Sequence, residues 1–242
     1  MDRERRLLIS IAQRLPTALT SDHLTILGVF GALLCGVCYA ASSLSPQFLW
    51  LASLGIVLNW FGDSLDGTLA RVRKIERPMY GFFIDHTTDV ASQLFIFIGL
   101  GLSPFMRFET ACLVLLSYWI AALYTFIRAI ATREFKISYY GIGPTEIRIG
   151  LLLYNFGIAI FGPMKAATPY GVFSLIDGIS VCIFFIVVGS FLLMVWQEGR
   201  RLARLDTPVD SKPLDTKLLD TKPLDTKPAG WTGPSPEEHE IA

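Results

Sequence analysis

The stretch GDSLDGTLAR, residues 62–71, follows directly on an apolar run and carries two aspartates, Asp63 and Asp66. A second acidic pair, Asp85 and Asp89, follows shortly after it. The i, i+3 spacing of the first pair and the i, i+4 spacing of the second each place two carboxylates on one face of a helix. Because the connection between the pairs is short, we expect two antiparallel neighbouring helices whose acidic ends converge on one point.

Converging carboxylates indicate a cation site. Like charges and burial both disfavour ionisation, so four close carboxylates need either protons or cations among them. Hard divalent cations prefer oxygen ligands, and the sequence has no Cys–His set with zinc spacing. Helix capping accounts for Asp85 or Asp89 but not for Asp63 and Asp66, which lie near a helix C-terminus, where the dipole disfavours anions. The pattern predicts Mg²⁺ or Mn²⁺, with two ions about 4 Å apart suited to phosphoryl displacement.

The composition indicates an integral membrane protein. The 242 residues are 52% hydrophobic and 17% charged, and the mean hydropathy is +0.49. A transmembrane helix needs roughly 20 apolar residues. We expect an all-α, multi-pass fold with six transmembrane helices, near residues 24–44, 47–62, 87–106, 109–127, 147–163 and 172–196.

The basic residues predict the orientation. All but two of the 21 Lys and Arg residues fall in the N-terminal segment, the loops after the second and fourth spans, and the C-terminal segment. The exceptions are Arg107 and Lys165. By the positive-inside rule, both termini and the acidic site are cytoplasmic, at the inner membrane if the source is bacterial. The formal net charge is zero, and no nucleic-acid partner is expected.

The two ends of the chain differ from the membrane domain, which we place at residues 1–204. RERRLLISIAQRL, residues 3–15, separates apolar and basic faces and fits an interfacial helix, although a plain basic flank would read the same way. Ser21 or Asp22 is then expected to cap the first span. Residues 205–242 repeat LDTK among prolines, and we expect a disordered, low-complexity tail.

Small residues and one arginine accompany the aspartates. Gly67 and Gly81 would let the backbone approach a bulky ligand closely. Ala70 keeps the same face open, and Arg71 supplies a planar phosphate donor. Each of them alone could equally serve helix packing.

In order, these residues form D-x-x-D-G-x-x-A-R from residue 63 to 71 and G-x-x-x-D-x-x-x-D from residue 81 to 89. This pattern resembles the signature of the CDP-alcohol phosphatidyltransferase (CDP-alcohol phosphotransferase) family over roughly residues 1–200. The resemblance implies an enzyme of phospholipid biosynthesis, with a CDP-linked donor, either CDP-diacylglycerol or a CDP-amino alcohol. An acceptor hydroxyl attacks the phosphorus that bears the non-cytidine group, and CMP leaves. The resemblance also implies contact with membrane lipids and a possible homodimer.

The resemblance assigns roles to single residues. The metal ligands are Asp63, Asp66 and Asp85, and Asp89 is the candidate general base, near or on the second ion. The residues that shape the CDP pocket are Gly67, Ala70, Arg71 and Gly81.

Two details resemble the choline/ethanolamine phosphotransferase branch. His86 gives the sequence DHTTD, and GIGPTEIRIG, residues 141–150, contains a Thr-Glu element. His86 could act as the general base together with Asp89, and Glu146 could contact an amine. Alternatively, both are ordinary interfacial residues. If the acceptor carries a phosphate, three basic residues beside this face would bind it, namely Arg133, Lys136 and Arg148; the alternative is that they only set topology.

Two rival functions use similar residues. An aspartate-rich membrane polyprenyl transferase also needs Mg²⁺ and a pyrophosphate, but its acidic motifs lie far apart in the chain. If the protein were a cation transporter, acidic residues would be expected near the bilayer centre. The four aspartates here are expected at one edge of the membrane.

Overall fold

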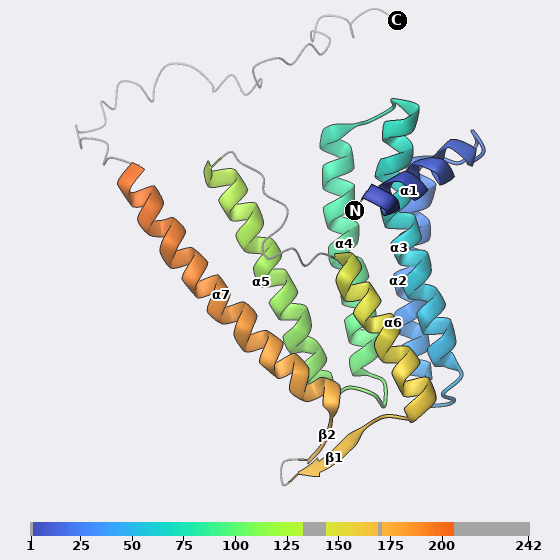
Figure 1. The fold of residues 1–242 in the computed structure, drawn as a ribbon, viewed down its shortest axis with the longest axis vertical. Coiled ribbons are helices and arrows are strands. Elements are labelled where there is room, and N and C mark those ends of the chain that lie inside the picture. The colour runs from blue at the N-terminus through green and yellow to red at the C-terminus, as the bar shows by residue number, and fades with distance from the viewer. Residues whose placement is uncertain (1, 133–143, 169–170, 206–242) are drawn as a thin grey trace, which may run out of the picture. The chain divides into compact units, whose positions relative to one another are not determined.

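The computed structural model describes residues 2–132, 144–168 and 171–205. The chain divides into a first unit, residues 1–196, and a second unit, residues 197–242. The described elements, in chain order, are α1 (Asp2–Arg14), α2 (Ser21–Ala41), α3 (Phe48–Arg73), α4 (Pro78–Gly101), α5 (Phe108–Thr132), α6 (Pro144–Phe161), β1 (Lys165–Thr168), β2 (Gly171–Ser174) and α7 (Leu175–Leu205) (Figure 1). The strands form a two-stranded antiparallel hairpin in which Lys165 pairs with Ser174. The predicted helical fold is confirmed, and the hairpin is an addition that the sequence analysis did not foresee.

Among the described helices, four are long and apolar enough to cross a membrane: α2, α3, α5 and α7. The other two helices at predicted spans are α4, with 24 residues, and α6, with 18 residues. Both carry polar side chains within their length, including Asp85 and Asp89 on α4 and Arg148 on α6. The spans predicted near residues 87–106 and 147–163 therefore stay predictions.

Helix α2 packs against both helices that carry the aspartates, and glycines allow the close approach. A Cβ atom on Gly62 of α3 would lie 2.5 Å from the backbone nitrogen of Gly28 on α2. A Cβ atom on Gly99 of α4 would overlap the backbone of Gly36, also on α2. Helices α3 and α4 themselves share few direct contacts. Helix α2 thus packs more extensively against α3 and α4 than these two helices pack against each other.

A buried apolar core stabilises this arrangement. It draws side chains from five helices, α2 to α6, and includes Tyr39, Ile56, Ile96, Leu115 and Ile158. In lipid, where apolar tails surround the helices, such side chains stabilise the bundle through close van der Waals packing rather than through removal from water. Many large apolar side chains of α7 are exposed, among them Phe185, Ile186 and Leu193, as expected of a helix that faces lipid.

Helix α1 is anchored to the end of α3. Leu8 and Ala12 of α1 are buried against Leu65 and Leu69 of α3. The guanidinium of Arg73 donates hydrogen bonds to backbone carbonyls of the segment that follows α1: those of Leu15, Pro16, Thr17 and Leu19. The helix expected in this segment is present, and its interfacial position stays a prediction.

The N-cap of the first span lies one residue before the earlier of the two predicted positions. Thr20 is the N-cap of α2, and its hydroxyl accepts a hydrogen bond from the backbone N–H of His23. The prediction of Ser21 or Asp22 as the cap was wrong, because the hydroxyl of Ser21 instead donates to the backbone carbonyl of Asp66.

In the second unit, the described residues 197–205 continue α7 as a helix. Arg201 lies 3.2 Å from Glu198 there, as an i, i+3 ion pair. The predicted disordered tail falls, from residue 206 on, outside the described residues.

Candidate active site

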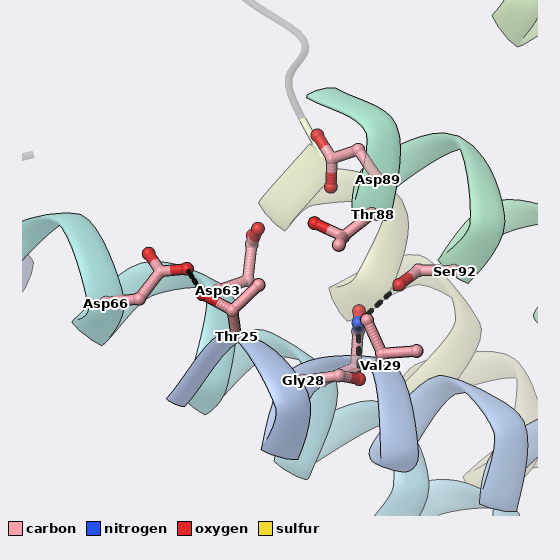
Figure 2. Close-up of a pocket in the computed structure, with 9 residues that line it drawn as sticks. Thr25, Gly28, Val29, Asp63, Asp66, Thr88, Asp89 and Ser92 are labelled. Carbon is pink, nitrogen blue, oxygen red and sulfur yellow. Dashed lines mark hydrogen bonds between the residues drawn. The ribbon is translucent and has the colours of Figure 1, made fainter. Parts of the chain in front are cut away.

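A polar cavity lies where α2, α3 and α4 meet. It has about 200 Å³ of empty space, its opening to solvent included. Figure 2 shows its lining, in which the carboxylate of Asp63 lies between those of Asp66 and Asp89. The lining residues are Thr25, Gly28, Val29, Asn59, Asp63, Asp66, Thr88, Asp89 and Ser92. Three of the four predicted acidic residues therefore share one cavity, and α2 supplies a wall that the acidic pattern does not reveal.

Of the three aspartates that line the cavity, Asp66 is the most deeply buried. It is 9% exposed, and one of its carboxylate oxygens accepts a hydrogen bond from the hydroxyl of Thr25 at 2.7 Å. The other oxygen accepts from the backbone N–H of Gly67 at 2.5 Å. Hydrogen bonds to a carboxylate are charge-assisted and about twice as strong as neutral ones, so α2 fixes the orientation of this side chain.

Asp63 and Asp89 are linked by an arginine from α6. Nη1 of Arg148 lies 2.8 Å from Oδ2 of Asp63, and Nη2 lies 3.8 Å from Oδ1 of Asp89. The side chain of Arg148 is 9% exposed. The guanidinium thus stands between an acidic residue of α3 and one of α4.

Asp85 and His86 are neighbours on α4, and Nδ1 of His86 lies 3.6 Å from Oδ2 of Asp85. The side chain of Asp85 is 47% exposed and is not among the cavity-lining residues. The His86 ring centroid lies 4.2 Å from that of Phe82 and 5.1 Å from that of Phe126 on α5. Its Nδ1 lies 2.8 Å from the carbonyl oxygen of Phe82. Of the two candidate bases, only Asp89 lines the cavity.

The residues predicted to hold CDP lie at the open end of α3 and the start of α4. Nη2 of Arg71 donates to the hydroxyl of Thr68 at 3.2 Å. A Cβ atom on Gly67 would lie 3.4 Å from Nη1 of Arg71, so the glycine leaves room for the guanidinium to fold back. Ala70 is half-buried. A Cβ atom on Gly81 would meet no atom within 4 Å, so this glycine borders open space.

The residues predicted to contact an amine or a phosphate differ in their positions. Arg148 is buried beside the carboxylates, while Glu146, in the first turn of the same helix, is exposed. Arg133 and Lys136 lie outside the described residues.

Two further polar residues form the floor of the cavity. The side-chain amide of Asn59 donates to the carbonyl of Gly28 at 3.0 Å and to the hydroxyl of Ser92 at 3.3 Å. The amide oxygen of Asn59 is buried and has no hydrogen-bond partner in the described structure, which is uncommon for a buried acceptor. Asn59 precedes Asp63 by one helical turn, so extending the acidic pattern back by four residues would have found it.

The donor set fits a hard divalent cation by its chemistry, because it consists of carboxylate oxygens without sulfur or imidazole. In the described part of the chain, however, no three His, Cys, Asp or Glu side chains stand close enough to hold a metal. The guanidinium of Arg148 supplies the positive charge next to Asp63 and Asp89.

Asp177 lies at the end of the bundle away from the cavity, where its hydrogen bonds stabilise the fold. It is 1% exposed. It accepts hydrogen bonds from the backbone N–H of Arg107 at 2.9 Å, the hydroxyl of Thr110 at 2.5 Å and the backbone N–H of Ser174 at 2.7 Å. These bonds satisfy the carboxylate and connect the hairpin, α5 and α7.

All the residues that line the cavity lie within a stretch that matches a known protein family. A family model described as CDP-alcohol phosphatidyltransferase matches residues 14–196. Archaetidylinositol phosphate synthase of Methanothermobacter thermautotrophicus is 33% identical over 149 residues, which cover 62% of this chain and 71% of that protein.

Proposed function

The chain belongs to the CDP-alcohol phosphatidyltransferase family, and from that premise we propose that it joins a CDP-linked glycerolipid to a phosphorylated polyol with release of CMP. It is a transferase of substituted phosphate groups in phospholipid biosynthesis. Family membership decides against the two rivals, a polyprenyl transferase and a cation transporter. The donor, the acceptor and the roles of single residues are our proposal.

A phosphorylated polyol, such as inositol phosphate, is the acceptor that the site favours. The similar protein is named for an archaetidylinositol phosphate product. Arg148 places a guanidinium beside the cavity, and a guanidinium binds phosphate through paired hydrogen bonds. Contacts of Arg133 and Lys136 with this phosphate stay predictions, since both lie outside the described residues.

The CDP group is proposed to bind at the open end of the cavity. Arg71 offers a guanidinium near the C-terminal end of α3, and the open space beside Gly81 leaves room for a nucleotide. The divalent cation would be held by Asp63, Asp66, Asp85 and Asp89. When bound, it supplies positive charge against the pyrophosphate and the departing CMP.

Asp89 is the proposed general base. The acceptor hydroxyl oxygen forms a bond to the phosphorus that carries the lipid, and its proton passes to the Asp89 carboxylate. The bond from that phosphorus to the bridging oxygen breaks, and CMP leaves with the electron pair. A base within hydrogen-bond reach contributes about 10²–10⁴-fold to the rate.

A second candidate is transfer from a CDP-amino alcohol to diacylglycerol. The observation that favours it is His86, which follows Asp85 in DHTTD and lies 3.6 Å from the Asp85 carboxylate. The ring packs on Phe82 and Phe126, so its role in base chemistry stays a prediction.

We propose that both termini and the cavity face the cytoplasm. The concentration of basic residues in the segments on that side supports this orientation. A homodimer stays a prediction.

The observation that carries the proposal is the shared cavity of Asp63, Asp66 and Asp89. The test is a substrate panel scored by CMP formed. CDP-diacylglycerol and its ether-linked analogue are each offered inositol phosphate or glycerol phosphate, and CDP-choline and CDP-ethanolamine are each offered diacylglycerol. We expect CMP from a CDP-lipid with inositol phosphate. CMP formed only from CDP-choline or CDP-ethanolamine would replace the proposal with the second candidate.

A further inference from the structure

Asn59 carries an unused hydrogen-bond acceptor at the floor of the cavity. The residue is 2% exposed and lines the cavity together with Asp63, Asp66 and Asp89. Its Oδ1 is buried and has no hydrogen-bond partner among the described residues. A buried polar atom that no protein group satisfies normally takes its hydrogen bond from a water molecule or from a ligand.

The orientation of the Asn59 amide is fixed by its neighbours. Its Nδ2 donates to the carbonyl oxygen of Gly28 on α2 at 3.0 Å and to the hydroxyl of Ser92 on α4 at 3.3 Å. A carbonyl oxygen can only accept a hydrogen bond, so the nitrogen of the amide must face Gly28. Since both N–H groups are used, Oδ1 is the atom that can bind a further group.

This atom selects the chemistry of its partner. An amide oxygen only accepts hydrogen bonds, so the partner must carry an O–H or N–H group. A substrate hydroxyl meets this requirement, whereas an ionised phosphate oxygen, itself an acceptor, does not. The floor of the cavity is therefore suited to the hydroxyls of a substrate rather than to its phosphate.

The position of Asn59 relative to the proposed base favours the polyol acceptor. Asn59 precedes Asp63 by four residues, and Ser92 follows Asp89 by three, so the amide lies about 5 Å further into the bundle than these two carboxylates. Two hydroxyls of one polyol can cover such a separation, with one donating to Asp89 and the other to Asn59. The ribose of the donor also carries two hydroxyls, but we place the nucleotide at the open end of the cavity, near Gly81.

We propose that Asn59 is a specificity-determining residue whose Oδ1 accepts a hydrogen bond from a substrate hydroxyl that does not react. The inference rests on the proposed function and deepens it. It explains how the cavity selects a polyol over an acceptor with a single hydroxyl.

The test measures CMP release by the full-length protein with CDP-diacylglycerol, or with its ether-linked analogue if that is the better donor. Inositol phosphate is compared with analogues that each lack one hydroxyl, and the donor is compared with forms whose ribose lacks one hydroxyl. We expect the wild type to prefer the parent acceptor over at least one deoxy analogue by about tenfold in kcat/KM, because a buried acceptor left unpaired is costly. In Asn59→Leu, this preference should fall toward one. Loss of a preference for a ribose hydroxyl would support the inference and assign the contact to the donor.

Asn155→Leu is the matched control. Asn155 is also 2% exposed, but it does not line the cavity, and its side-chain oxygen and nitrogen are paired with Tyr39 at 2.8 Å and Ser53 at 2.9 Å. Both substitutions remove hydrogen bonds inside the bundle, so the Tm should fall in both. Only Asn59→Leu should change the preference between substrates.

The inference is overturned if folded Asn59→Leu keeps every preference of the wild type, or if it loses activity equally with all substrates. A water molecule would then be the partner of Oδ1. If Asn59→Leu does not fold, Asn59→Ala is measured by the same criterion. Absence of CMP from the wild type with every phosphorylated polyol would instead overturn the proposed function, and the inference with it.

Discussion

The hydroxyl of Thr25 on α2 donates a hydrogen bond of 2.7 Å to the buried carboxylate of Asp66 on α3. This bond joins a helix without acidic residues in the cavity to the helix that carries the acidic motif. It orients one carboxylate oxygen and leaves the remaining lone pairs for other partners. Thr25 is therefore a positioning residue for the proposed metal site.

Thr25→Val tests this role. The substitution keeps the shape of the side chain but removes the hydrogen bond from α2 to the Asp66 carboxylate, at a cost of about 1–3 kcal/mol for a buried group. We expect weaker Mg²⁺ binding, seen as a higher Mg²⁺ concentration for half-maximal CMP release. Thr125→Val is the control, since among the described residues the hydroxyl of Thr125 donates within its own helix, to the carbonyl of Ala121. Equal Mg²⁺ requirements in the two variants would argue against a positioning role.

Substitutions at Asp89 and His86 can show which of the two residues acts as the general base. Asp89 lines the cavity, whereas the ring of His86 packs between Phe82 and Phe126. Asp89→Asn is expected to lower the turnover number by about 10²–10⁴-fold, as for loss of a general base. His86→Gln is expected to lower it by less than about tenfold. The measurement is CMP release at saturating donor and acceptor, and the reverse order of effects would transfer the role to His86.

Gly81 offers a test of the nucleotide site that spares the fold. A Cβ atom there meets nothing within 4 Å, so Gly81→Ala should leave the Tm unchanged. We expect the KM for the CDP-linked donor to rise, because the added methyl group would occupy space proposed for the nucleotide.

Gly99→Ala provides the contrast, since its methyl group would overlap the backbone of Gly36. Overpacking of this kind typically costs 1–3 kcal/mol, and the Tm should fall. An unchanged donor KM in Gly81→Ala would place the nucleotide elsewhere.

Asp177→Asn is expected to destabilise the fold without changing the chemistry. The carboxylate accepts hydrogen bonds from Arg107, Thr110 and Ser174 at the end of the bundle away from the cavity. Hydrogen bonds to a charged group contribute about 1.5–3 kcal/mol each. The Tm should fall, while the Mg²⁺ requirement of the folded fraction stays that of the wild type. A changed Mg²⁺ requirement would link Asp177 to the site.

The sequence predicted the parts of this site that follow from local spacing. Asp63 and Asp66 share one helical face, and Asp85 and Asp89 share another. Their side chains could therefore be grouped in pairs without a structure. The order and approximate bounds of the helices followed from runs of apolar residues in the same way.

Contacts between helices could not be predicted in this way. The glycines of α2 are visible in the sequence, but nothing local states that Gly28 meets α3 or that Gly36 meets α4. Thr25 and Asn59 entered the site only through this packing. Arg148 was a weak candidate because the same residue also fits the positive-inside pattern, and only its position between Asp63 and Asp89 distinguishes the two roles.

The central claim is that the aspartates of α3 and α4 hold a divalent cation on which transfer from the CDP-linked donor depends. Its most direct test is CMP release by the purified protein, after treatment with EDTA and with Mg²⁺ or Mn²⁺ then restored, in the wild type and in Asp66→Asn and Asp85→Asn. We predict that EDTA abolishes CMP release, that either metal restores it in the wild type, and that neither restores it in the folded variants. CMP release that continues in EDTA, or at wild-type rates in either variant, would contradict the claim.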